Sequence, residues 1–173
     1  MRIKIILIFV IFIQFLGCSK SYEDDKKEII KLLNENSQCY RQKNLDCIMS
    51  TYLNDSTTIA LGTEKNFIGK GFESIKENYK KDIAQNWVLL NYIYKNPIIF
   101  IKDDIAWLTA DVYSNLKISI INEFDESEDI IIELDSRLTA VCRKVNGKWK
   151  FVLTNFQHFT NPAEKIKTNE ETN

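Results

Sequence analysis

The sequence "SRLTAVCRKVNGKWKFVLTNFQHFT", from Ser136 to Thr160, predicts two antiparallel strands and the turn that joins them. Apolar and polar residues alternate along both halves, which is the two-residue period of a strand. Asn146-Gly147 at the centre favours a two-residue turn in which both residues have positive φ. Val145 is then expected to lie opposite Lys148, and this pair sets the register of the hairpin.

This register predicts two faces for the hairpin. One face, expected to lie on helices, carries Trp149, Cys142 with Phe151, Ala140 with Leu153, Leu138 with Asn155, and Ser136 with Gln157. The other carries Arg143 with Lys150, Val141 with Val152, Thr139 with Thr154, Arg137 with Phe156, and Asp135 with His158. His158, the only histidine, is therefore expected on the outer face. A single β-bulge would reverse the parity and turn it inward.

The segment from Ile105 to Ile120 predicts a strand with the same division of faces. The set expected to lie against the helices is aliphatic and comprises Ala106, Leu108, Ala110, Val112 and Leu116. The opposite set comprises Trp107, Thr109, Asp111, Tyr113 and Asn115. Its two aromatic residues suggest a semi-apolar outer face that pairs with a second subunit, so we expect a homodimer through the sheet. The alternative is a solvated sheet with scattered aromatic residues.

Helical patterns precede the strands. Ser21 with Asp24 resembles a capping box, and an apolar stripe continues to about Arg41. Further helices are predicted over 45–53 and, after Gly71, over 72–84. Strands are predicted over 57–61, 87–94, 98–101, 105–120, 130–145 and 148–160. Helices followed by an antiparallel meander indicate the α+β class.

The N-terminus has the pattern of an export signal. Arg2 and Lys4 precede the apolar run from Ile5 to Leu16, which is too short for a membrane span of about 20 residues. Phe15-Leu16-Gly17-Cys18 resembles the bacterial lipobox, in which the cysteine is acylated and becomes the new N-terminus. The alternative is an ordinary signal peptide with an incidental cysteine. Several acyl chains on one residue bind a bilayer stably.

We therefore predict a signal peptide over 1–17, a lipidated N-terminus and tether over 18–23, one domain over 24–162 and a polar tail over 163–173. The protein is expected in the cell envelope, anchored to the lipid bilayer through acylated Cys18. By resemblance to bacterial sorting rules, Ser19 in place of aspartate directs it to the outer membrane where one exists.

Composition limits the remaining function classes. The net charge of the full chain is −1, and removal of Arg2 and Lys4 makes it more negative, so no basic stripe for nucleic acid is expected. Cys39 and Cys47 form a disulfide or remain buried thiols like Cys142, and their spacing fits no metal site. Acidic residues between 123 and 129 indicate a solvated hairpin tip, with a cation site as the alternative. No metal or cofactor is predicted.

Five short motifs in order resemble the NTF2-like superfamily and, within it, the SnoaL-like domains. They are "NLDCIMSTYLND", "LGTEKNFIGKGFESI", "DDIAWLTADV", "SRLTAV" and "NGKWKFV". The resemblance covers about 24–162 and implies a cone-shaped fold, in which a strongly curved, mostly antiparallel sheet wraps around N-terminal helices. It also implies a pocket at the open end and, in many members, dimerisation through the sheet.

The chain departs from that pattern at two positions. Members often have a histidine six residues after the hairpin tryptophan, where this chain has Asn155. The related kinase association domain often has an arginine at about the position of Ala140. The Asp–His pairs of catalytic members therefore do not transfer to this chain, and anion binding loses support.

Two functions remain open. The first is a membrane-anchored module that binds a small, largely apolar ligand or a protein partner, with ligand contacts predicted from Tyr52, Ser136, Leu138, Asn155 and Gln157. The second is an isomerase, dehydratase or hydrolase that uses a pocket residue as general base. The candidate bases are His158, Asp55, Asp111 and Asp135. The position of these side chains relative to the cavity separates the two functions.

Overall fold

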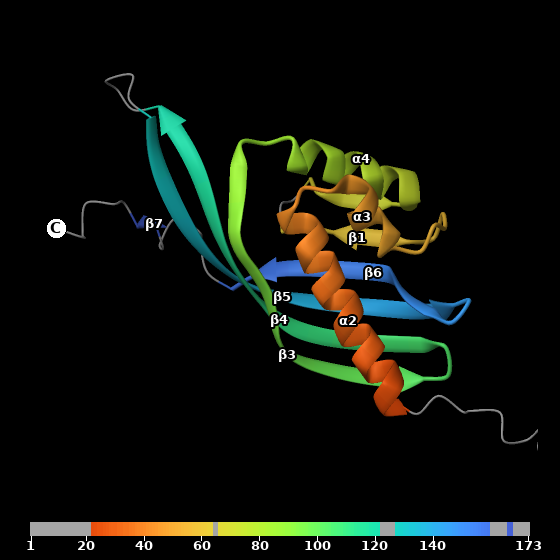
Figure 1. Ribbon diagram of the computed structural model, residues 1–173. Helices are drawn as coiled ribbons and strands as arrows, with labels where there is room; N and C mark the ends of the chain where they lie inside the picture. Colours follow the sequence, from red (N-terminus) through yellow and green to blue (C-terminus); the bar gives the residue numbers. More distant parts are fainter. Residues whose placement is uncertain (1–21, 64–65, 122–126, 160–165, 168–173) are drawn as a thin grey trace, which may run out of the picture.

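The computed structural model describes residues 22–63, 66–121, 127–159 and 166–167 (Figure 1). Its elements, in chain order, are α2 (Tyr22–Arg41), α3 (Leu45–Ser50), β1 (Ile59–Leu61), β2 (Ile68–Lys70), α4 (Phe72–Ile83), β3 (Trp87–Lys102), β4 (Ile105–Ile121), β5 (Ser127–Val145), β6 (Lys148–His158) and β7 (Ile166–Lys167). The α+β class and the order of helices and long strands agree with the sequence prediction.

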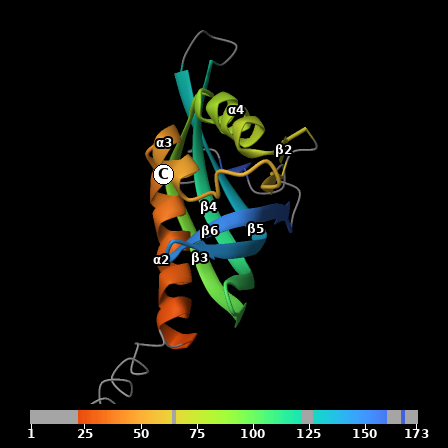
Figure 2. The same cartoon turned by 90° about the vertical axis from the view of Figure 1, so that its right-hand side faces the viewer.

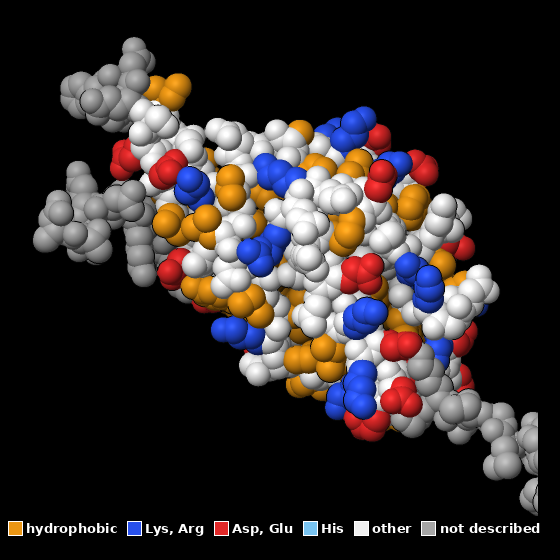
Figure 3. Space-filling model, in the orientation of Figure 1, with side chains coloured by type: hydrophobic (Ala, Val, Ile, Leu, Met, Phe, Trp, Pro, Cys, Tyr) orange, Lys and Arg blue, Asp and Glu red, His pale blue; other side chains and the backbone are white. Residues whose placement is uncertain are grey.

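A curved, unclosed sheet forms one layer, with the strand order β2-β1-β6-β5-β4-β3. Its neighbours are antiparallel except β1 and β6, which are parallel. Helix α2 crosses the concave face, and α3 and α4 lie near one end of the sheet (Figures 1 and 2). On the face that carries α2, basic and acidic side chains are interspersed (Figure 3). The short strands β2 and β7 were not predicted.

The predicted helices form, with one difference in length. In α2 the apolar stripe is buried through Ile29, Leu32 and Leu33. Gly71 precedes α4 with φ of 82°, a conformation that suits glycine. Helix α3 ends at Ser50 and not at Leu53, because the chain turns to pair with β6: Leu53 N donates to Phe151 O at 2.9 Å.

A disulfide joins Cys39 at the end of α2 to Cys47 in α3. Their Cα atoms are 5.4 Å apart, within the usual range for a disulfide. This answers the question that the sequence left open for these two residues. Cys142 is a free, buried thiol, and burial raises its pKa to about 12.

Strand β3 is continuous where two strands were expected. The pairing of β3 with β4 shifts between Lys95 and Ile98, at Asn96-Pro97, so the chain bends without leaving the sheet. In β4 the predicted division of faces is confirmed: Ala106, Leu108 and Val112 are buried, whereas Trp107 is 48 % exposed.

The β5–β6 hairpin has the predicted turn but a different register beyond it. Asn146 and Gly147 have φ of 51° and 76°, and Val145 lies opposite Lys148. The register then shifts: Cys142 pairs with Phe151, whereas Val141 pairs with Leu153. Val152 is therefore an extra residue in β6, and the parity of every later residue is reversed.

Because of this bulge, the predicted faces of β6 are wrong for the residues after Val152. Ala140 lies opposite Thr154, Leu138 opposite Phe156, and Ser136 opposite His158. The expected pairs of Leu138 with Asn155, Ser136 with Gln157 and Asp135 with His158 are wrong. The bulge lies where the other edge of β6 changes partner, from the segment at Thr51–Leu53 to β1.

A partly buried ion pair joins the start of α2 to the hairpin. Asp25 Oδ1 accepts hydrogen bonds from Lys144 Nζ at 2.5 Å and from Trp149 Nε1 at 3.1 Å. Asp25 is 8 % exposed and Trp149 is 4 % exposed. We call this end of the molecule, with the turns after β3 and β5, the narrow end.

The predicted export signal, Cys18 and Ser19 lie outside the described residues, as do Ser21 and most of the acidic tip and the polar tail. Within the described part of the chain, no helix is long and apolar enough to cross a membrane. At the base of the acidic tip, Asp129 accepts from Lys117 Nζ at 2.9 Å and from Ser119 Oγ at 2.6 Å.

Candidate functional site

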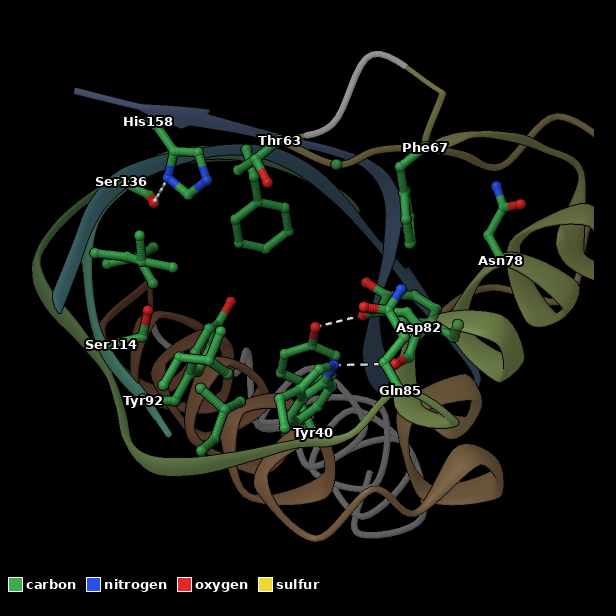
Figure 4. Close-up of a pocket in the computed structure, with 18 of the residues that line it drawn as sticks. Tyr40, Thr63, Phe67, Asn78, Asp82, Gln85, Tyr92, Ser114, Ser136 and His158 are labelled. Atoms are coloured by element: carbon green, nitrogen blue, oxygen red, sulfur yellow. Dashed lines mark hydrogen bonds between the residues drawn. The ribbon is translucent and has the colours of Figure 1, made fainter. Parts of the chain in front are cut away.

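A cavity of about 740 Å³ lies between the C-terminal half of α2, helix α4 and the concave face of the sheet (Figure 4). Most of its wall is apolar. Six of its lining residues are aromatic: Tyr40, Phe67, Tyr79, Trp87, Tyr92 and Phe156. Exposed residues at the rim include Thr63, Lys81 and Gln85.

His158 lies on one wall of the cavity, contrary to the sequence prediction. Its Nδ1 is 2.8 Å from Ser136 Oγ, and the ring edge with Nε2 points into the cavity (Figure 4). Ser136 is 5 % exposed, so the hydroxyl that holds the ring is itself fixed by packing. Burial lowers the pKa of His158 below its usual value of 6.5. At neutral pH the imidazole is therefore neutral, and Nε2 is the ring nitrogen on the cavity side.

A second polar group lies on the opposite wall, from α4 and α2. The Tyr40 hydroxyl donates to Asp82 Oδ2, and Trp87 Nε1 donates to the backbone oxygen of Asp82 at 3.0 Å. The bond from Tyr40 holds the carboxylate across the cavity from His158, and the bond from Trp87 holds the backbone of Asp82 (Figure 4). Asn78, one turn earlier in α4, also lines the cavity, and its Nδ2 has no hydrogen-bond partner among the described residues.

Two lining residues, Tyr79 and Asn36, belong to hydrogen-bond networks with neighbours outside the lining. Tyr79 and Tyr52 bond through their hydroxyls at 2.8 Å, and Tyr52 also bonds to Thr154 Oγ1 at 3.0 Å. Asn36 accepts from Tyr94 at 3.1 Å and donates to Thr51 at 3.0 Å. Burial is the main cause that raises the pKa of Tyr52, Tyr79, Tyr92 and Tyr94. These tyrosines therefore remain protonated at physiological pH.

The five predicted ligand contacts are not brought together. Ser136 lines the cavity. Tyr52 and Leu138 are buried in the core, at 3 % and 0 % exposure, and Tyr52 lies beneath the cavity through its bond to Tyr79. Asn155 and Gln157 lie opposite Thr139 and Arg137 on the outer face, because the bulge reverses the parity of β6.

Of the predicted bases, only His158 lines the cavity. Asp55 forms a turn with Thr57, whose backbone N–H and hydroxyl lower the pKa of this exposed carboxyl. Asp111 pairs with Arg137 at 3.2 Å on the outer face. The backbone oxygen of Asp135 accepts a hydrogen bond from Phe159 N at 3.0 Å. Asp135 is the neighbour in β5 of Ser136, which is the residue opposite His158.

The sequence reasoning missed Tyr40, Asn78 and Asp82 as site residues. A signal for two of them exists in α4, where Asn78 follows Ile75 by three residues and Asp82 follows Tyr79 by three. Polar residues at this spacing border the apolar stripe of a helix. Residues at the border of the stripe face a cavity when core side chains do not fill the space beneath the helix. Among the described residues, no group of three or more metal-ligating side chains gathers at one place.

Comparisons with known proteins address the fold. No family model and no curated protein matches this chain. Among solved structures, it is similar to a candidate dehydratase from the NTF2-like family of Streptomyces avermitilis, with a TM-score of 0.67 and 11% identity over 82% of this chain and 100% of that one. The chain has the NTF2-like fold.

Two further structures agree. An NTF2-like superfamily protein from Salmonella enterica has a TM-score of 0.63 and 14% identity, and the match covers 82% of this chain and 95% of that one. A candidate scytalone dehydratase from Novosphingobium aromaticivorans has a TM-score of 0.61 and 16% identity, over 79% and 85% of the two chains. At such identities the likeness shows the NTF2-like fold and not an activity.

Proposed function

We propose that this NTF2-like protein binds a small, largely apolar molecule in the cavity and is held at a membrane through Cys18. One observation carries the binding proposal: six aromatic side chains line a space of about 740 Å³. Sites for small molecules are typically apolar clefts of roughly 300–1,000 Å³, in which a few polar groups set the orientation. Here His158, Ser136 and Asp82 supply those groups. The membrane anchor rests on the sequence pattern alone.

A variant that fills the cavity tests the binding proposal. Leu116 lines the cavity from β4, and Tyr113 lies on the opposite face of the same strand. Leu116→Trp is expected to reduce binding of the dye 1-anilinonaphthalene-8-sulfonate at least tenfold, and Tyr113→Trp is expected to leave it unchanged. Thermal melts of both variants check that each remains folded. Equal dye binding by the two folded variants would contradict a ligand site in the cavity.

Native mass spectrometry of the gently extracted protein provides the ligand itself. We expect wild type and Tyr113→Trp to retain a bound mass that Leu116→Trp loses. The same measurement gives the number of subunits, which tests the predicted homodimer.

Proton transfer is the second candidate function, and the inward position of His158 favours it. A neutral imidazole with Nε2 free toward the cavity can remove a proton from a bound molecule, and its lowered pKa keeps it in the basic form at neutral pH. Catalysis is expected to appear as deuterium incorporation when the retained ligand is incubated with the protein in heavy water. His158→Gln should abolish incorporation while the ligand remains bound; incorporation by this variant would exclude His158 as the base.

A further inference from the structure

The outer face of the sheet carries a small apolar patch at the narrow end. Ile98, Phe100 and Trp107 are 57 %, 53 % and 48 % exposed. The rings of Phe100 and Trp107 stack with centroids 5.8 Å apart, because the two residues lie opposite each other on β3 and β4. We call these three residues the outer aromatic patch.

The start of α2 contacts the same part of β3 that carries this patch, although the helix lies on the opposite face of the sheet. Tyr22, the first residue of α2, donates through its hydroxyl to Ile99 O at 3.0 Å, between Ile98 and Phe100. Both views place the start of α2 at the same end as the β3–β4 turn (Figures 1 and 2). Cys18 precedes Tyr22 by four residues, which span at most about 14 Å when extended. A link of this length is short enough for an acyl chain on Cys18 and the patch to meet the same bilayer.

We propose that the outer aromatic patch inserts into the lipid interface next to the anchor and fixes the orientation of the domain on the bilayer. This inference rests on the lipid anchor of the proposed function. Tryptophan and other aromatic side chains favour the interfacial region of a bilayer, and exposed Lys102 follows Phe100 on the same face of β3. Three side chains bind a membrane weakly on their own. Tethering by Cys18 supplies a high effective concentration, so weak contact is sufficient.

Tryptophan fluorescence tests the proposal without new labels. Trp107 is the exposed tryptophan, whereas Trp87 and Trp149 are 6 % and 4 % exposed. The full lipidated protein is placed in vesicles of phosphatidylethanolamine and phosphatidylglycerol that contain phosphatidylcholine brominated near the middle of one acyl chain. Bromine quenches tryptophan only at close range. We expect wild-type emission to fall by about a fifth or more, and Trp107→Phe to show no quenching.

Two variants sharpen the result. Phe100→Ser should halve the quenching of Trp107. The control is Val88→Ser: Val88 is also in β3 and is 52 % exposed, but it lies at the end of the strand near the cavity, so this variant should leave the quenching unchanged. Failure of the anchor is detected separately: wild type should sediment with vesicles, and Cys18→Ser should remain in solution. Anchored protein whose Trp107 is not quenched by brominated lipid would overturn the patch proposal. If Trp107 is also protected from acrylamide, a second copy occupies this face instead.

Discussion

The narrow end and the cavity end of this protein differ in how their polar groups are used. At the narrow end, Asp25 in the first turn of α2 accepts hydrogen bonds from Lys144 and Trp149. At the cavity end, His158 and Asp82 are held by Ser136 and Tyr40 on walls that face open space. Side chains beside a cavity have fewer contacts, so the narrow end should contribute more stability and the cavity end should contribute the chemistry.

The largest expected effect is in the core beneath α2. Ile29 is fully buried, so Ile29→Ala should lower the free energy of unfolding by about 2–5 kcal/mol. Leu134→Ala, on the cavity wall, should cost less than about 2 kcal/mol because part of that side chain already lacks contacts. Urea unfolding measures both. Equal losses would remove the contrast between the two ends.

The ion pair at the narrow end should have the next largest effect. Asp25→Ala leaves Lys144 and the Trp149 N–H without their buried acceptor, and we expect a loss of about 1–3 kcal/mol. Glu77→Gln removes the exposed i,i+3 pair with Lys80 and should change stability by less than about 0.5 kcal/mol. Thermal and urea unfolding measure the two variants. An Asp25→Ala protein as stable as Glu77→Gln would show that this contact does not stabilise the fold.

The smallest expected effect is the titration of His158. His158 is the only histidine, so the NMR signal of its imidazole carbon protons titrates without overlap from another histidine. This titration should show a pKa below 6.5. The folded protein then binds fewer protons at this site than the unfolded chain does. Its stability contribution is therefore present above about pH 6.5 and is lost as the pH falls through the folded pKa.

Comparison with His158→Gln isolates this contribution. As the pH falls below about 6.5, the melting temperature of wild type should fall relative to that of the variant. A pKa above 6.5, or a difference in melting temperature that does not depend on pH, would indicate that His158 is not desolvated in the cavity.

The helices and most of the long strands could be predicted from local sequence, because each depends on residues close together in the chain, whereas the short strands β2 and β7 and the continuity of β3 were missed. Asn146-Gly147 specifies its turn wherever it lies, and the alternation from Ala106 to Val112 identifies the buried face of β4. The position of His158 could not be predicted in this way. It depends on the bulge at Val152, and that bulge lies where β6 changes its neighbour from the segment after α3 to β1. Such a neighbour is supplied by a distant part of the chain.

The cavity residues from the helices were missed for a related reason. Asp82 and Asn78 are polar positions at the border of an apolar stripe, a pattern that a solvated helix also shows. Only the space that the curved sheet leaves beneath α4 makes them site residues. The disulfide between Cys39 and Cys47 was one of two outcomes that the spacing allowed, and the turn between α2 and α3 brings the two residues together.

Helix α2 has 20 residues, which correspond to about 30 Å, and the cavity residues Asn36 and Tyr40 lie near its last turn. The proposed anchor, Cys18, precedes its first residue by four positions. With the proposed anchor in place, the helix would act as a spacer that keeps the cavity above the lipid headgroups. A ligand would then reach the cavity through water and not from the hydrocarbon layer, so occupancy would follow its dissolved concentration. A compound that partitions strongly into the bilayer would be withdrawn from this protein and not delivered to it.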